Sequence, residues 1–342
     1  MTDPKGLDLT ALQGWLGQKH PGILDGPLTA SLITGGKSNL TYIVSNGSRD
    51  LVVRRPPLGH VLATAHDMGR EHRVMAALAP TDVPVPRMFA HCEDTEVLGA
   101  PFYVMERVAG TPYSRAAQLE PLGAERTGAI TERLVDTLVA LHAVDYQEVG
   151  LGDFGRPDGY LGRQVSRWKK QLVSSTSREL PGMDELIAQL EGTIPTSSEG
   201  TIVHGDYRLD NVLVDDNDRV TAVLDWEMST LGDPLTDVAV LLAYQQLAEV
   251  APPSADGAAL VTDAALAPGY LSRDAVLARY AEGSGRDVSD IGFHLALAFF
   301  KLAVILEGIH YRHSHGQTVG SGFDGIGDMI VPLVAAGRAA SR

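Results

Sequence analysis

The sequence of 342 residues contains a single cysteine, Cys92, and few positive charges for its length. One cysteine excludes a disulfide bond within the chain and a zinc site built from several cysteines. There are 28 lysine and arginine residues against 43 aspartate and glutamate residues, which gives a formal net charge of −15. Nucleic acids and anionic membranes bind basic surfaces, so neither is expected as a partner.

The sequence also lacks a recognisable targeting or membrane segment. Its first residues do not show the basic segment and apolar run of a secretory signal. The most apolar long stretch, 291–309, contains His294, Lys301 and Glu307. These side chains favour a buried core helix over a membrane span. The sequence therefore predicts a cytoplasmic protein with no membrane partner, and it leaves the oligomeric state open.

The first third of the chain has the pattern of a small sheet. Runs rich in β-branched residues at 39–44 and 51–54 flank the pair Asn46-Gly47, which is typical of a hairpin turn. Spacing of apolar residues predicts helices over 8–18 and 63–78, and Pro80 closes the second. Further strands are expected at 87–91 and 102–108.

Helical patterns dominate after residue 110. Helices are expected at 122–143, 160–172, 183–190, 275–282 and 291–312. Short strands interrupt them at 202–203, 212–214 and 220–224, and a turn at 215–218 joins the last two. This pattern predicts an α+β fold with two lobes: an N-terminal nucleotide-binding lobe of antiparallel strands and one helix (1–105), a hinge (106–110), and a larger helical C-terminal lobe (111–342).

The stretch from 204 to 225 carries the chemistry of phosphoryl transfer. Asp206 and Asn211 lie five positions apart in an expected loop, and Asp225 ends the strand that follows. Kinase catalytic loops have this spacing, with the Asp orienting the nucleophile and the Asn binding Mg²⁺. Asp and Asn are frequent in ordinary turns. The complete arrangement, in a chain whose first third suits a nucleotide lobe, favours the catalytic interpretation.

A glycine-rich segment precedes the first of these strands. Gly35, Gly36 and Ser38 resemble the end of a P-loop, but Ser31 stands where that motif needs glycine. A strand follows instead of the required helix. We therefore favour a turn that covers the phosphates of ATP through Gly35, Gly36, Ser38 and Asn39. An ordinary surface turn is the alternative, because glycine pairs are common in loops.

Together these motifs resemble the aminoglycoside phosphotransferase and choline kinase family, over roughly residues 30 to 312. Within it, the chain is most similar to the kinase-like domains of some acyl-CoA dehydrogenases. The residues that carry the resemblance are His204-Gly-Asp206-x₄-Asn211, Leu224-Asp-Trp-Glu227, Leu231-Gly-Asp-Pro234-x₂-Asp237, Leu51-Val-Val-Arg-Arg-Pro-Pro57, Arg70-Glu-His-Arg73 and Phe102-Tyr-Val-Met-Glu106.

The resemblance implies a protein-kinase-like fold that uses ATP, with GTP as the alternative nucleotide, and Mg²⁺. It implies that Asp206 is the catalytic base or orienting carboxylate, and that Asn211 and Asp225 are the Mg²⁺ ligands. Asp237 is expected to brace the catalytic loop.

The resemblance also implies a set of nucleotide-binding residues. Glu71 would pair with the phosphate-binding cation, and the backbone from Glu106 to Val108 would bind adenine. Kinases carry lysine at the strand position where this chain has Arg54, and arginine keeps the charge with a different geometry. Arg55 is a substitute, although strand alternation directs it to the other face.

The resulting prediction is transfer of the γ-phosphate of ATP to a hydroxyl of a small molecule. The acceptor is an antibiotic such as an aminoglycoside or macrolide, or a hydroxylated or hydroxyacyl metabolite. Residues 155–195 and 245–312 are expected to form the acceptor pocket. A nucleotide-binding regulatory pseudokinase is the alternative, which the intact Asp206, Asn211 and Asp225 argue against. A protein kinase is disfavoured, because no Asp-Phe-Gly or Ala-Pro-Glu segment is present.

Overall fold

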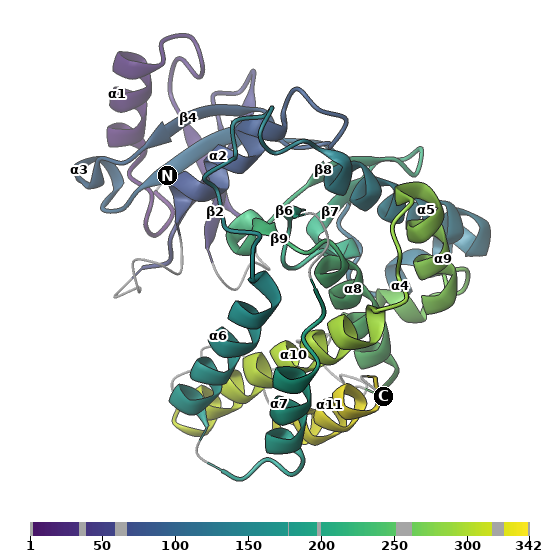
Figure 1. Cartoon of the computed structure of the whole chain (residues 1–342). Helices are drawn as coiled ribbons and strands as arrows, with labels where there is room; N and C mark the ends of the chain where they lie inside the picture. The colour runs from purple at the N-terminus through teal and green to yellow at the C-terminus, as the bar shows by residue number, and fades with distance from the viewer. Residues whose placement is uncertain are drawn as a thin grey trace. The chain divides into compact units, whose positions relative to one another are not determined.

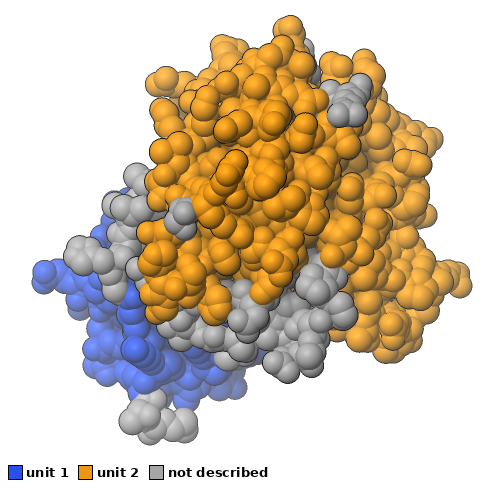
Figure 2. All heavy atoms as spheres, turned by 90° about the horizontal axis from the view of Figure 1, so that it is seen from below, with its two compact units in different colours: residues 1–110, 221–229 blue, residues 111–220, 230–342 orange. Residues whose placement is uncertain are grey.

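The computed structural model describes residues 3–33, 39–58, 67–176, 178–196, 200–250, 262–316 and 325–340. The chain divides into two compact units, which Figure 2 distinguishes by colour. The first comprises residues 1–110 and 221–229, and the second comprises residues 111–220 and 230–342. The chain passes from the second unit back to the first inside strand β8 (Val220–Val223).

The first unit is built on a five-stranded antiparallel sheet with the strand order β1-β2-β3-β5-β4. Its strands are β1 (Thr29–Leu32), β2 (Leu40–Ser45), β3 (Asp50–Arg55), β4 (Met88–Cys92) and β5 (Phe102–Glu106). The predicted hairpin joins β2 to β3. Its turn forms because the Asn46 side-chain oxygen accepts the N–H groups of Ser48 (3.1 Å) and Arg49 (2.9 Å). Gly47 supplies a positive φ of 86° there.

Helices complete the first unit. Leu12 and Leu16 of α1 (Leu9–Lys19) share a core cluster with Tyr42 and Val44 of the sheet. The helix α2 (Met68–Leu78) begins where the Asp67 side chain accepts the Arg70 N–H at 2.9 Å, and it packs against β4 and β5. The predicted residues 63–66 of this helix lie outside the described residues. A short helix, α3 (Thr95–Leu98), follows β4.

The second unit is mostly helical (Figure 1). Its helix α10 packs against α6, α7, α8 and α11. Among the described helices, α10 alone has the length and composition of a membrane span, and 78% of that window is buried inside the structure. The α-helices are α4 (Ala116–Leu119), α5 (Gly123–Ala143), α6 (Tyr160–Ser175), α7 (Met183–Gly192), α8 (Leu235–Val250), α9 (Arg273–Ser284), α10 (Ile291–Ser314) and α11 (Ile326–Ala340).

Short strands and a 3₁₀ turn frame the loop that carries the kinase-like motif. Strand β6 (Thr201–Val203) pairs antiparallel with β9 (Thr230–Gly232), and a 3₁₀ helix at Leu209–Asn211 leads into β7 (Val212–Val214). The turn predicted after β7 is present, because the Asp215 side chain accepts the N–H groups of Asn217 and Arg219, each at 2.9 Å. The antiparallel sheet and the helical second part confirm the predicted α+β class.

Candidate functional site

A buried carboxylate fixes the start of the catalytic-type loop in the second unit. Asp237, in the first turn of α8, is completely buried. Its two oxygens accept the backbone N–H groups of His204 and Gly205, each at 2.7 Å, and His142 Nε2 lies 3.3 Å away. Gly205 has a φ of +87°, which an L side chain rarely adopts. The bracing role predicted for Asp237 therefore corresponds to hydrogen bonds in the structure.

The charge of Asp237 follows from these contacts. Burial alone would raise its pKa, because an apolar environment disfavours a carboxylate. The hydrogen bond from His142, electrostatic interactions with His142 and His204, and the Gly205 N–H outweigh burial and hold the pKa of Asp237 below its usual value. Asp237 is therefore an ionised brace.

Asp206 and Asn211 contact each other directly. The Asn211 side-chain amide donates to the Asp206 backbone oxygen at 2.9 Å and to the Asp206 Oδ2 at 3.2 Å. The amide nitrogen of Asn211 is thus directed at Asp206, and its side-chain carbonyl oxygen is the atom suited to a cation. The predicted Asp and Asn therefore act as one unit at the end of the loop.

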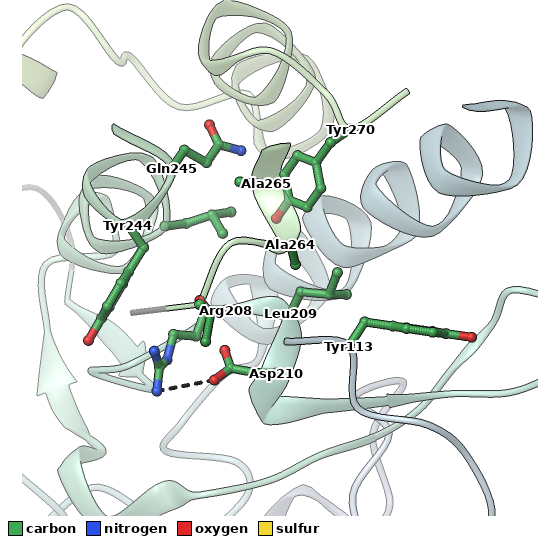
Figure 3. A pocket seen from close by; sticks show the side chains of 11 residues that line it. Tyr113, Arg208, Leu209, Asp210, Tyr244, Gln245, Ala264, Ala265 and Tyr270 are labelled. Atoms are coloured by element: carbon green, nitrogen blue, oxygen red, sulfur yellow. Dashed lines mark ion pairs between the residues drawn. The ribbon is translucent and has the colours of Figure 1, made fainter. Parts of the chain in front are cut away.

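Two further residues contact Asp206 that the sequence analysis did not select. Arg208 places its Nε 3.4 Å from the Asp206 carboxylate and one of its terminal nitrogens 3.3 Å from that of Asp210. Its guanidinium lies 4.5 Å from the ring centre of Tyr244, which comes from α8, and Figure 3 shows the two side by side. Burial raises the pKa of the Tyr244 hydroxyl, and the negative charge of Asp206 adds to this shift, so the two groups lie close together. Arg208 lies inside the 204–211 motif, and this position was the only sequence feature that could have indicated its role. No sequence feature indicated a role for Tyr244.

Lys301 brings a buried positive charge to the same loop. It lies in the middle of α10, is 8% exposed, and donates to the backbone oxygen of Gly205. Its ammonium nitrogen lies 5.8 Å from the ring centre of Trp168. Burial lowers its pKa, while the charges of Asp206 and Asp237 oppose that shift. A lysine within an apolar helical segment is the sequence feature that could have indicated this role; in the sequence it served only as evidence against a membrane span.

A cationic face of α6 lies near Lys301. Arg167 is close enough for its charge to lower the pKa of Lys301. An open surface hollow of about 640 Å³, called the α6 cavity below, lies along this helix; all seven residues that line it come from α6, and three of them are the cations Arg163, Arg167 and Lys170. The helix therefore presents positive charge in a chain whose net charge is strongly negative.

In the first unit, Arg54 of β3 is held by two carboxylates. Its Nε lies 3.3 Å from Glu71 of α2, and another guanidinium nitrogen pairs with Asp225. Glu71 is 1% exposed and also accepts the Tyr103 hydroxyl (2.9 Å) and the Asn39 amide (3.2 Å). The predicted pairing of Arg54 with Glu71 is therefore present. Arg55 points elsewhere, because it donates to the backbone oxygens of Gly6 and Leu98, each at 2.6 Å.

Acidic groups accumulate around Arg54. Burial raises the pKa of Glu71 to about 7; Arg54 opposes this, and the nearby charges of Asp225 and Glu227 add to it. Burial would lower the pKa of Arg54 itself, but Tyr103, Glu71 and Asp225 raise it. Asp225 has a φ of +66°, which is rare and costly for a residue other than glycine. Asp225 is thus held in a strained conformation beside two further carboxylates, with Arg54 as the cation that pairs with it.

The donors suit Mg²⁺ chemically. In the part of the chain that the structure describes, no group of three or more His, Cys, Asp or Glu side chains could hold a metal alone. Mg²⁺ prefers oxygen donors and commonly uses one or two protein groups together with substrate phosphates. Asp225 in the first unit and Asn211 in the second each offer an oxygen donor of that kind.

The other residues predicted to bind the nucleotide lie in different parts of the first unit, and three of them lie outside the described residues. Gly35, Gly36 and Ser38 lie outside the described residues. Asn39 is buried, and its amide bridges Glu71 and Glu227 (3.4 Å to the latter). Glu106 is exposed at the end of β5, where its N–H donates to the Arg87 oxygen at 2.9 Å. Val108 is half-buried in the segment after β5.

The fold and the two residue groups define a small-molecule kinase-like architecture, and comparison with known proteins assigns the family. A model of the phosphotransferase enzyme family matches residues 29–278, so the chain belongs to that family. Acyl-CoA dehydrogenase family member 11 of Rattus norvegicus is 34% identical across 98% of this chain and 43% of its own length. The chain therefore spans less than half the length of that relative.

Solved structures agree with the fold. A protein of Ralstonia eutropha described as a candidate aminoglycoside phosphotransferase has 36% identity and a TM-score of 0.82, covering 98% of both chains. A thermostable mutant of aminoglycoside phosphotransferase APH(4)-Ia, in complex with AMP-PNP and hygromycin B, has a TM-score of 0.62 and 17% identity, covering 97% of this chain and 98% of that chain. At that identity the likeness concerns the fold alone.

Proposed function

We propose that the chain transfers the γ-phosphoryl group of ATP, with Mg²⁺, to a hydroxyl of a small molecule. The observation that carries the proposal is Asp206, whose carboxylate is held by Asn211 in a loop fixed by the ionised Asp237. Phosphoryl transfer asks mainly for positioning and charge neutralisation from the protein. A fixed carboxylate with an adjacent metal-type donor meets that demand.

Each residue has a role in this proposal. Asp206 accepts a hydrogen bond from the acceptor hydroxyl and so directs the hydroxyl oxygen at the γ-phosphorus. Asp206 then receives the hydroxyl proton as the oxygen bonds to phosphorus and ADP leaves. The Asn211 carbonyl oxygen and the Asp225 carboxylate would hold Mg²⁺, which supplies charge neutralisation for the phosphates. Arg54, kept in place by Glu71 at 3.3 Å, binds phosphate oxygens. The AMP-PNP in the related APH(4)-Ia structure supports ATP as the donor.

The local charge favours an acceptor that carries a carboxylate or phosphate. Lys301 lies beside the loop of Asp206, and Arg163, Arg167 and Lys170 line the α6 cavity. These cations would repel a polycationic aminoglycoside and attract an anionic hydroxylated or hydroxyacyl metabolite. The acyl-CoA dehydrogenase relative supports the same choice.

A panel assay tests the proposal. ATP consumption with and without Mg²⁺ would be measured against short hydroxy acids, their acyl thioesters, aminoglycosides and macrolides. One hydroxylated anionic compound should be phosphorylated by the wild type, with a loss of at least about a hundredfold in Asp206→Ala. The exposed Asp274→Ala serves as the matched control and should retain activity. Phosphorylation that persists undiminished in Asp206→Ala would refute the assigned role.

One observation favours a second candidate, a regulatory nucleotide-binding protein without turnover. Arg54 replaces the usual lysine and pairs directly with Asp225, the carboxylate proposed for Mg²⁺. Such a pair could persist in the bound state and block metal binding. Under this alternative, ATP binding would be independent of Mg²⁺ and no acceptor would be consumed.

A further inference from the structure

Resting on the proposed function, we infer that Arg208 and Tyr244 are positioning residues that together hold the Asp206 carboxylate in its reactive orientation. Two groups contact this carboxylate, the amide of Asn211 (3.2 Å) and the guanidinium of Arg208 (3.4 Å), and the hydroxyl of Tyr244 lies near it. An aspartate side chain rotates about two bonds, and contacts from several directions remove that freedom. One oxygen can then face the acceptor hydroxyl.

Arg208 is suited to this role by its shape. Its planar guanidinium spans the carboxylates of Asp206 and Asp210, at 3.4 Å and 3.3 Å, while its face lies 4.5 Å from the Tyr244 ring centre. A lysine is a point charge and reproduces neither the fork nor the stacking. Asp210 and Tyr244 therefore fix Arg208, and Arg208 in turn fixes Asp206.

Tyr244 contributes through two separable groups. Its ring lies against the guanidinium of Arg208, and its hydroxyl lies near the carboxylate of Asp206. The residue comes from α8, the helix that also supplies Asp237. One helix thus supports the start of the loop in two ways: Asp237 accepts the backbone N–H groups of His204 and Gly205, and Tyr244 lies against Arg208, which pairs with Asp206.

The space behind this pair is too small for a substrate. Arg208, Asp210, Tyr244, Gln245 and Tyr270 line a cavity of only about 20 Å³, which Figure 3 shows from close by. That volume corresponds to about one water molecule. Among the described residues, this cavity has no room for a substrate, so we assign Arg208 and Tyr244 a positioning role through Asp206 and not substrate binding.

Two pairs of variants separate the contributions. Tyr244→Phe keeps the ring and removes the hydroxyl, while Tyr244→Leu removes both. Arg208→Lys keeps the positive charge but not the planar guanidinium, and Arg208→Gln removes both. Misplacement of a reacting group by about 1 Å costs on the order of a hundredfold in rate. We expect kcat to fall about tenfold in Tyr244→Phe and on the order of a hundredfold in Tyr244→Leu and Arg208→Gln, with KM for ATP and acceptor within about threefold.

The control is Arg279→Gln, which removes another arginine paired with two carboxylates, Glu132 and Asp136, on α5. It should leave kcat unchanged. Added guanidinium ion should restore part of the activity of Arg208→Ala, which a merely structural arginine would not allow. A KM increase without a fall in kcat, or no rescue, would overturn the inference.

Crystal structures of Tyr244→Phe and Arg208→Gln give a readout that needs no turnover. The Asp206 side chain should rotate or show several conformations, and its contact with Asn211 should lengthen. An Asp206 that keeps its conformation in both variants would refute the positioning role, even if no acceptor is ever found. Absence of phosphotransfer by the wild type would instead refute the proposed function.

Discussion

At the residue scale, both oxygens of the ionised Asp237 accept a hydrogen bond from a backbone N–H group. An asparagine at this position would turn its NH₂ group toward one of them and leave a buried N–H without an acceptor. We expect Asp237→Asn to lower the free energy of unfolding by about 3–5 kcal/mol, the cost of breaking a buried charged contact. Thermal unfolding measures this. Exposed Asp274→Asn, also in the first turn of a helix, is the control, and equal stability of both variants would contradict the bracing role.

The same residue predicts a pH dependence of stability. The folded pKa of Asp237 lies below the ordinary value of 3.8, so the unfolded state binds its proton more readily. Its contribution to stability is therefore complete above about pH 4 and is lost as the pH falls through the folded pKa. Chemical unfolding between pH 2 and pH 6 should show a steeper acid loss in the wild type than in Asp237→Asn. Parallel curves would show that Asp237 is not the group responsible.

At the element scale, α10 combines an apolar surface with one buried cation. Keeping Lys301 dehydrated costs stability, and an apolar residue of similar length often restores it. We expect Lys301→Met to unfold at the same or a higher temperature, while phosphotransfer falls at least about tenfold because the Gly205 carbonyl loses its partner. Lys169→Met, which removes an exposed pair with Glu191, is the control. Full activity in Lys301→Met would show that Lys301 is not needed for the reaction.

Most elements with a regular pattern could be predicted from the sequence, whereas helix α8 and strands β1 and β9 were not predicted. The hairpin of β2 and β3 has two runs of β-branched residues around an Asn-Gly turn, so its position was predicted within a residue or two. Helix α8 is apolar on nearly all sides because the second unit surrounds it, so it has no amphipathic period. Strands β1 and β9 have only four and three residues. Tyr244 was missed with α8, since its role depends on a contact with a loop distant in sequence.

At the scale of the whole molecule, the net charge is −15, so a local surface with several positive charges differs from the chain as a whole. The net charge alone does not choose between a cationic and an anionic acceptor, because composition carries no information on where charges gather. The fold resolves this for the second unit, where helical spacing places Arg163, Arg167 and Lys170 along one cavity on α6. The preference for an anionic acceptor thus follows from placement and not from net charge.

That preference predicts a selective effect on the acceptor. Arg167→Gln combined with Lys170→Gln should raise KM for an anionic acceptor about tenfold, with kcat and KM for ATP nearly unchanged, because these exposed side chains attract the substrate without contacting Asp206. The wild-type KM should rise with salt, and the double variant should respond less, since exposed charges are screened beyond about 8 Å at physiological ionic strength. Lys169→Gln is the matched control, because Lys169 is the immediate neighbour of Lys170, pairs with Glu191 and lies outside the cavity lining. An equal rise in KM for Lys169→Gln would mean that only the general charge of α6 matters, whereas a fall in KM for the double variant would point to a cationic acceptor.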